Sequence, residues 1–121
     1  MDIRRFGVTS EHGPLISRGV IHNGTLYLSG VTAAGLEADT ADQTRAVLKT
    51  IEALLAEAGT DKDRVLTAHI WLADMADFQI MNAVWNDWVD ADRPPARTCV
   101  SGELYDPDCR IEIAVTASVD A

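Results

Sequence analysis

The most informative stretch of the chain is Pro94-Pro95-Ala96-Arg97-Thr98-Cys99-Val100. Its two prolines stiffen the approach, because proline fixes the backbone φ angle and removes an N–H donor. A strand-like segment follows, so Arg97 lies where a rigid loop becomes a strand. An arginine mounted in this way can hold one carboxylate through two parallel hydrogen bonds. On position alone, a surface arginine paired with one of the 19 acidic residues is the alternative interpretation.

Composition predicts a single acidic domain that spans residues 1–121. The chain is 47% hydrophobic and has a net charge of −9, which suits one domain with a real core. No apolar run approaches the ~20 residues that span a bilayer, and Met1-Asp2-Ile3-Arg4-Arg5 has no apolar signal core. We therefore expect a cytoplasmic protein. The ten basic residues are scattered, which argues against a nucleic-acid partner.

The cysteines and histidines do not indicate a metal site. Cys99 and Cys109 lack metal-ligand spacing, and we expect free thiols. His12, His22 and His69 have no ligand spacing either. We expect neither a metal ion nor an organic cofactor.

The first third of the chain predicts antiparallel strands. Ile3–Gly7 is a candidate edge strand, and Arg18–His22 and Thr25–Gly30 are strand-like runs on either side of Asn23-Gly24. An Asn-Gly pair between two such runs is a strong hairpin signal, because a type I′ turn needs positive φ at both positions.

Two helices are expected in the middle of the chain. Thr40-Ala41-Asp42-Gln43 fits a capping box for the first, and Gly59 is a natural stop. Asp74 can cap the second, which we expect to run from Met75 to about Asp90. Its buried stripe is predicted to contain Phe78, Met81, Trp85 and Trp88. Asn82 lies beside this stripe, where it either braces a loop or lines a site.

Three further strands complete an α+β fold with both helices on one face of a mixed sheet. They are expected at Val65–Ala73, Thr98–Leu104 and Arg110–Val119. In the first, Leu66, Ala68, Ile70 and Leu72 share one face. In the last, Ile111, Ile113, Val115, Ala117 and Val119 share one face. The face away from the helices is predicted to carry His69, Trp71, Arg97, Cys99 and Glu112. An uncovered face of this kind favours self-association as a symmetric oligomer.

Several motifs together resemble the Rid family (reactive intermediate deaminase, also called YjgF or L-PSP). They are Leu28-Ser29-Gly30, Asp77-Phe78 with Asn82, Pro95-Ala96-Arg97-Thr98-Cys99-Val100, and Ile111-Glu112-Ile113. The resemblance extends from about Gly13 to Ala117 and is closest to the YoaB-like branch. It implies a chorismate-mutase-like fold and a homotrimer whose sites lie in the clefts between subunits.

The resemblance also implies roles for individual residues. Arg97 matches the arginine that binds the substrate carboxylate, and Glu112 matches the glutamate thought to position or activate water. Ser29, Gly30, Asn82 and Cys99 match residues that line the site. The usual aromatic after Gly-Pro is here Leu15, and the usual Gln after Ser-Gly is Val31. From the residues alone, Glu112 is equally a solvated strand glutamate paired with Arg110 or a neighbour.

These roles predict an enamine/imine deaminase. It would hydrolyse reactive 2-imino acids, of the 2-aminoacrylate type, to 2-oxo acids and ammonia, with a small 2-imino or 2-oxo carboxylate as its ligand. One alternative is a trimer that binds small carboxylates without turnover, as a metabolite sensor or regulator. An endoribonuclease is a less favoured alternative, because the chain is acidic.

Overall fold

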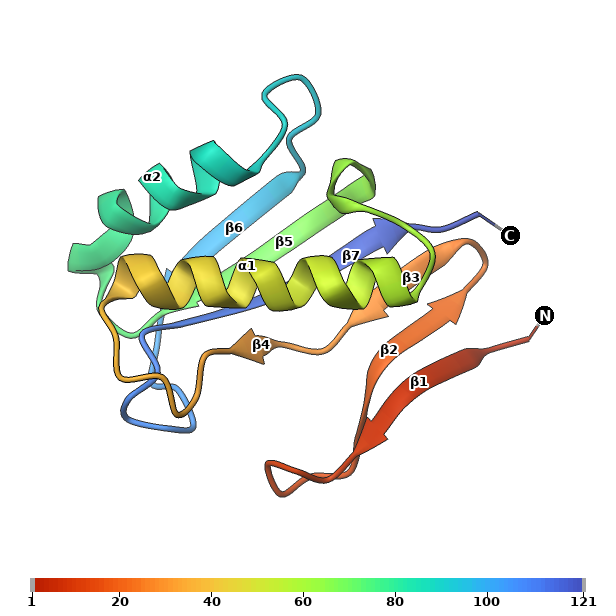
Figure 1. Ribbon diagram of the computed structural model, residues 1–121, viewed down its shortest axis with the longest axis horizontal. Coiled ribbons are helices and arrows are strands. Elements are labelled where there is room, and N and C mark those ends of the chain that lie inside the picture. The colour runs from red at the N-terminus through yellow and green to blue at the C-terminus, as the bar shows by residue number, and fades with distance from the viewer. Residues whose placement is uncertain (1, 121) are drawn as a thin grey trace.

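The protein forms one mixed sheet covered on one face by two helices (Figure 1). The structure is a computed structural model that describes residues 2–120. The strands are β1 (Arg4–Thr9), β2 (Ile16–His22), β3 (Thr25–Leu28), β4 (Val31–Thr32), β5 (Val65–Leu72), β6 (Ala96–Ser101) and β7 (Ile111–Ser118). The helices are α1 (Thr40–Glu57) and α2 (Phe78–Trp88), with short 3₁₀ turns η1 (Lys62–Arg64) and η2 (Met75–Asp77).

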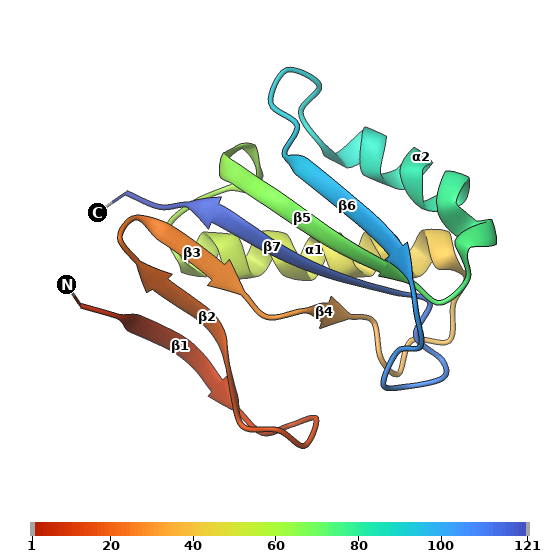
Figure 2. The same cartoon turned by 180° about the vertical axis from the view of Figure 1, so that it is seen from behind.

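The strand order is β1-β2-β3-β7-β5-β6, and β4 also pairs with β7. Among the strands of residues 2–120, only β5 and β6 pair in parallel; the other pairs are antiparallel. Seen from behind, the sheet face opposite the helices is uncovered along β5, β6 and β7 (Figure 2). The predicted α+β class, with both helices on one face of a mixed sheet, is confirmed.

The β2–β3 hairpin forms where it was predicted. Asn23 has φ 53° and Gly24 has φ 76°, and His22 pairs with Thr25 across the turn. Both positions have positive φ, as a type I′ turn requires.

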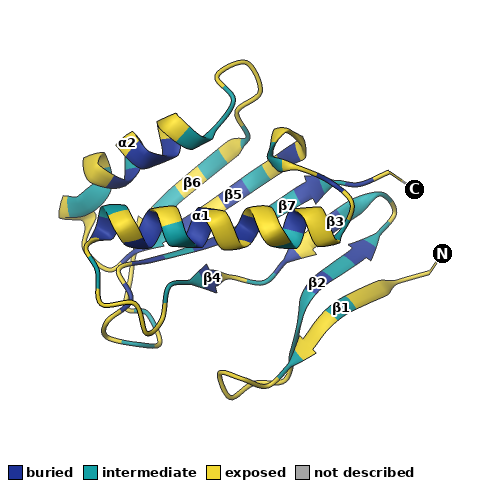
Figure 3. Ribbon diagram, viewed as in Figure 1, coloured by how far each residue is buried: buried dark blue, intermediate teal, exposed yellow. Residues whose placement is uncertain are grey.

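Strand β7 supplies the middle of the core. Its residues alternate between buried and half-buried along its whole length, and the buried set faces α1 as predicted. Figure 3 shows buried and exposed residues alternating along α1, and the buried residues Val47, Leu48, Ile51 and Leu55 belong to the same core as the buried residues of β7. Among the residues that the structure describes, no helix is long and apolar enough to cross a membrane.

The predicted faces of β5 are wrong at its first residues. Val65 is buried and Leu66 is 47% exposed, because the register with β7 shifts between Val65 and Thr67. An extra residue in one strand turns the side chains before it to the opposite face. From Ala68 onwards the prediction is confirmed.

The predicted capping box of α1 is also wrong. The N-cap is Asp39, whose side chain accepts from the backbone N–H of Asp42 at 2.9 Å. The Thr40 hydroxyl donates to Asp77 instead, at 2.6 Å. The Gln43 side chain is buried, and it bonds loop backbone rather than the cap. The predicted end is confirmed, since Gly59 follows the helix with φ 85°.

Helix α2 is shorter than predicted. Asp74 accepts from Ala76 N at 2.9 Å, but it caps η2 rather than α2. The helix begins at Phe78 and ends at Trp88, where Val89 turns to extended backbone. Met81, Val84 and Trp85 are its buried residues, so the predicted stripe is confirmed in its centre.

The prediction that placed Arg97 and Cys99 on the uncovered face is wrong. Ala68 pairs with Arg97 and Ile70 pairs with Cys99, and paired residues share a face. Ala68 and Ile70 are buried in the core beneath the helices. Arg97 and Cys99 therefore face α2, while His69, Trp71 and Glu112 lie on the uncovered face as expected.

Candidate functional site

Arg97 lies on the edge strand β6 with its side chain against α2. Its Nη2 donates to Asn82 Oδ1 at 2.8 Å, and its Nη1 contacts Met81 Sδ at 3.7 Å. The guanidinium carbon lies 5.4 Å from the ring centre of Trp85 and 5.8 Å from that of Phe78, within cation–π range. Helix α2 thus fixes the orientation of the guanidinium.

No carboxylate pairs with Arg97 among the described residues. The alternative of an ordinary surface ion pair is therefore not what the structure contains. A guanidinium has five N–H donors, and most of them stay free for an anionic ligand. Asn82, which the sequence left as bracing a loop or lining a site, contacts Arg97.

Cys99 lies two residues further along β6 and is half-buried. Burial raises the pKa of its thiol, although the nearby charge of Arg97 acts in the opposite direction. The thiol is consequently protonated at neutral pH, and a thiolate nucleophile is disfavoured.

Ser29, Gly30 and Glu112 meet at a second place. They line a pocket of about 310 Å³ at the end of β3, beside β7. The Glu112 carboxylate packs closely against Gly30, and a Cβ at this position would displace it. Ser29 N donates to the Arg18 carbonyl at 3.0 Å, which fixes the turn that leads to Gly30.

Burial raises the pKa of Glu112. The alternative of an ion pair with Arg110 is not observed in residues 2–120. A carboxyl group that is half-buried in a pocket, with no ion pair to it among the described residues, is a candidate for proton transfer.

Within one chain, Arg97 and Glu112 do not meet. Trp71 pairs with Glu112 on one side and with Val100 on the other, so two strand spacings and three residues along β6 separate the two Cα atoms. At about 4.8 Å per strand and about 3.3 Å per residue, they lie about 14 Å apart. Their side chains also point to opposite faces. The predicted site residues therefore form two groups, Arg97–Asn82–Cys99 and Ser29–Gly30–Glu112.

Three residues of the Glu112 pocket were given no functional role by sequence reasoning. Arg18, His12 and Tyr105 all line it. The rings of His12 and Tyr105 lie 5.6 Å apart, and Tyr105 Oη lies 3.4 Å from Thr32 Oγ1 and 3.5 Å from His12 Nδ1. One sequence signal pointed to the loop that contains His12: the family has an aromatic residue after Gly13-Pro14, at the position of Leu15, and that residue belongs to the wall of the family's pocket. Leu15 itself is 77% exposed and does not line the pocket.

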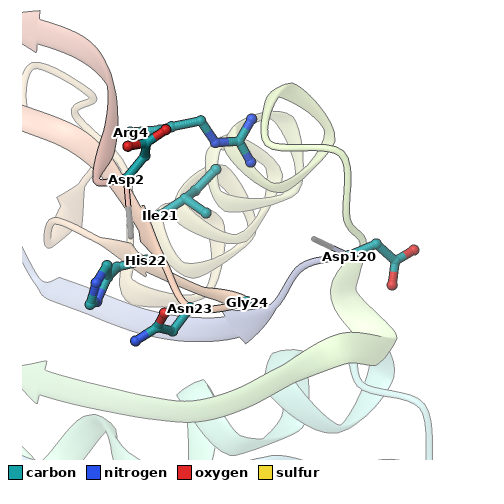
Figure 4. A pocket seen from close by; sticks show the side chains of 7 residues that line it. All are labelled: Asp2, Arg4, Ile21, His22, Asn23, Gly24 and Asp120. Carbon is teal, nitrogen blue, oxygen red and sulfur yellow. The ribbon is translucent and has the colours of Figure 1, made fainter.

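Another pocket, of about 540 Å³, lies near the β2–β3 hairpin turn (Figure 4). It is lined by Asp2, Arg4, Ile21, His22, Asn23, Gly24 and Asp120. None of the predicted site residues is among them, and we assign this pocket no function.

Comparison with known proteins decides the family. The family model described as Endoribonuclease L-PSP matches residues 12–119. The chain belongs to this family. The resemblance to Rid (YjgF, L-PSP) proteins that the sequence motifs carried is thereby confirmed.

Individual L-PSP family members are similar over most of the chain. The RutC family protein YoaB of Escherichia coli K12 is 43% identical over 100 residues, 83% of this chain and 87% of that protein. NMB1025 of Neisseria meningitidis, a YjgF family member, has a crystal structure with a TM-score of 0.91 at 45% identity, covering 100% of this chain and 98% of that one. The 3-aminoacrylate deaminase RutC of Acinetobacter baylyi is 44% identical over 81 residues, 67% of this chain and 64% of that protein.

The chemistry available to this L-PSP family chain follows from its two groups of residues. Between residues 2 and 120, no three His, Cys, Asp or Glu side chains lie close enough to hold a metal ion. What the chain offers is an oriented cation, Arg97, on one face of the sheet and a half-buried carboxyl, Glu112, on the other. Together they suit a small anion and a proton transfer.

Proposed function

We propose that this protein is a deaminase that hydrolyses 2-imino acids, and their enamine tautomers, to 2-oxo acids and ammonia. The observation that carries the proposal is the guanidinium of Arg97, oriented by Asn82 and two aromatic rings but paired with no carboxylate among the described residues. Membership of a family that includes a protein named 3-aminoacrylate deaminase supports deamination as the reaction class.

The complete site forms between two copies of the chain in a homotrimer. One copy supplies Arg97, Asn82 and Cys99, and its neighbour supplies Ser29, Gly30 and Glu112. Support comes from the two faces of the sheet, since one chain cannot bring both groups onto one ligand. The uncovered face also exposes large side chains, with Tyr27 at 49% and Val100 at 45%, as expected of a surface that a partner covers.

Arg97 binds the substrate carboxylate through two parallel hydrogen bonds. This fixes the position of the adjacent C2 atom, which carries the imine nitrogen. Fixing C2 next to a water molecule supplies the proximity part of the catalysis.

Glu112 handles the proton. In its ionised form it takes a proton from water as the water oxygen bonds to C2 and the C=N π electrons move to nitrogen. The proton passes to that nitrogen and gives a carbinolamine. Glu112 then moves the hydroxyl proton to the amino group, the C–N bond breaks as the C=O bond forms, and ammonia leaves. One water is consumed and no oxidant or reductant is needed. General acid–base catalysis of this kind contributes about 10²–10⁴-fold.

The test is a coupled assay in which an amino acid oxidase generates 2-imino acids from several L-amino acids. The rate of imine loss is followed with wild type, Arg97→Ala and Arg93→Ala. Arg97→Ala is expected to lower kcat/KM on the order of 100-fold or more, because a bound carboxylate loses its cation. Arg93 pairs with Asp90 and is 64% exposed, so Arg93→Ala should match wild type.

Other outcomes would replace the proposal. Binding of 2-oxo acids with no acceleration of any imine would indicate a carboxylate-binding trimer. RNA cleavage that persists through purification and is lost in Arg97→Ala would indicate the endoribonuclease of the family description. The net charge of −9 argues against RNA as a substrate.

A further inference from the structure

The Glu112 pocket contains an arginine of its own. Arg18 lines it together with Ser29, Gly30 and Glu112, whereas Arg97 faces α2. The backbone of Arg18 is bonded to Ser29, the residue that begins the Ser29-Gly30 turn. The side-chain stem of Arg18 lies against Gly7 of β1, where a Cβ would overlap it. Gly7 therefore leaves room for the stem of Arg18.

The present partner of Arg18 is easily replaced. Its Nη2 donates to Glu11 Oε2 at 2.9 Å, and the two side chains are 33% and 63% exposed. Exposed pairs of this kind contribute only about 0–1 kcal/mol, and the bond uses one of the five N–H donors of the guanidinium. A ligand carboxylate in the pocket can therefore replace Glu11 at little cost.

We propose that Arg18 makes the site selective for 2-imino acids that carry a second acid group at the end of the side chain. The inference rests on the proposed function: Arg97 of one copy holds the carboxylate next to the imine, and Arg18 of its neighbour holds the second one. The pocket volume of about 310 Å³ lies at the lower end of the range for small-ligand sites, about 300–1,000 Å³, which suits a short dicarboxylate.

The test measures binding of stable 2-oxo acids, so it does not depend on turnover. Calorimetry compares 2-oxoglutarate with 2-oxopentanoate, which has the same chain length and one carboxylate fewer. Wild type is expected to bind 2-oxoglutarate at least about tenfold more tightly, because a charged hydrogen bond is gained. Arg18→Gln should weaken 2-oxoglutarate binding at least about tenfold more than 2-oxopentanoate binding.

Glu11→Gln is the matched second variant and acts in the opposite direction. It removes the competing carboxylate while Arg18 stays, so 2-oxoglutarate should bind more tightly than to wild type. Equal effects of Arg18→Gln on both ligands, or no effect on either, would overturn the role of Arg18.

The experiments distinguish failure of the deaminase proposal from failure of the proposal for Arg18. Selective 2-oxoglutarate binding without imine hydrolysis keeps the role of Arg18 in binding and removes the reaction. Imine hydrolysis with no difference between the two 2-oxo acids removes the role of Arg18 alone.

Discussion

At the scale of single residues, the environment of Arg97 is unusual because it orients the side chain without neutralising it. Asn82 accepts one hydrogen bond from Arg97, and the rings of Trp85 and Phe78 on α2 lie against the guanidinium. An aromatic face and an amide oxygen attract the cation but bring no opposing charge. A ligand carboxylate then meets a full positive charge in a fixed orientation.

Asn82 is predicted to position Arg97. Asn82→Leu removes the acceptor 2.8 Å from Nη2, and kcat/KM should fall about tenfold, mainly through KM, since a hydrogen bond to a charged group contributes about 1.5–3 kcal/mol. Steady-state kinetics with a 2-imino acid check this. Gln79→Ala is the control, because Gln79 contacts only the far end of the Asn82 amide at 3.4 Å. A fully active Asn82→Leu would make Asn82 structural only.

The pH dependence should report Glu112. Burial raises its pKa, so the carboxyl keeps its proton to a higher pH than the ordinary value of about 4.3. Because the ionised form is the proposed base, the acid limb of kcat/KM should lie above that ordinary value. Glu112→Gln should lose the limb together with most of the activity. A limb at the ordinary glutamate value would argue against Glu112 as the base.

The pH dependence of the free energy of unfolding gives an independent test of the raised pKa of Glu112. Between the ordinary and the raised value the folded chain binds more protons than the unfolded chain, so the free energy of unfolding falls as pH rises. Glu112→Gln should therefore be more stable than wild type at about pH 7 and gain nothing below about pH 4. Thermal melts at the two pH values measure the difference.

At the scale of elements, the buried Gln43 side chain joins α1 to two loops. Its Nε2 donates to the carbonyls of Leu36, Ala38 and Asp108 at 3.3, 3.3 and 2.9 Å, and its Oε1 accepts from Arg110 N at 2.8 Å. The Gln43 amide thus supplies hydrogen-bond partners to backbone groups of two loops, the β4–α1 connection and the β6–β7 connection.

Gln43→Leu is predicted to lower the free energy of unfolding by about 3 kcal/mol. The substitution keeps the volume nearly constant but leaves buried backbone groups without partners, each at about 1–3 kcal/mol. Urea unfolding measures the loss. Asp42→Ala is the control, because Asp42 makes an exposed pair with Arg45 and should change stability by less than about 0.5 kcal/mol. A loss below about 1 kcal/mol for Gln43→Leu would mean that water replaces the amide.

Most of the fold was predictable from short stretches of sequence. The Asn23-Gly24 turn and the alternation along β7 depend only on neighbouring residues, and both were predictable. Leu66 was misplaced because a bulge is set by pairing with β7, which the alternation within β5 does not contain. The cap of α1 was missed for a related reason, since Gln43 has partners 65 residues away.

The candidate site was predictable in its residues but not in its arrangement. Arg97 and Cys99 share a face, as expected, yet which face depends on the register of β6 with β5. A shift of one residue would reverse it. Arg18 reaches the pocket through tertiary packing, which no motif encodes.

At the scale of the whole molecule, the sheet keeps the two halves of the proposed site, Arg97–Asn82–Cys99 and Ser29–Gly30–Glu112, on separate faces. Trp71 and His69, whose rings lie 6.4 Å apart, occupy the uncovered face between them. Sedimentation should give three times the 13.1 kDa chain mass. A stable monomer would remove the shared site.

Mixing two inactive variants tests the shared site directly. Arg97→Ala and Glu112→Gln each lose activity alone, but trimers reassembled from an equal mixture should regain about a quarter of the wild-type sites, because some sites combine intact residues of two copies. The measurement is imine hydrolysis after joint unfolding and refolding. Separately refolded variants, mixed afterwards on ice, are the control. No recovery in the reassembled sample would place both residues in one chain's site.

The amide of Gln43 also constrains how this protein can diversify. The loop from residue 33 to 39 and the loop from residue 102 to 110 are anchored to a single side chain, and the second of these carries Tyr105 into the Glu112 pocket. An insertion or deletion in either loop shifts the anchor of the other. When loops are exchanged between homologues, the two segments and residue 43 should therefore be transferred together, because each loop is bonded to that side chain.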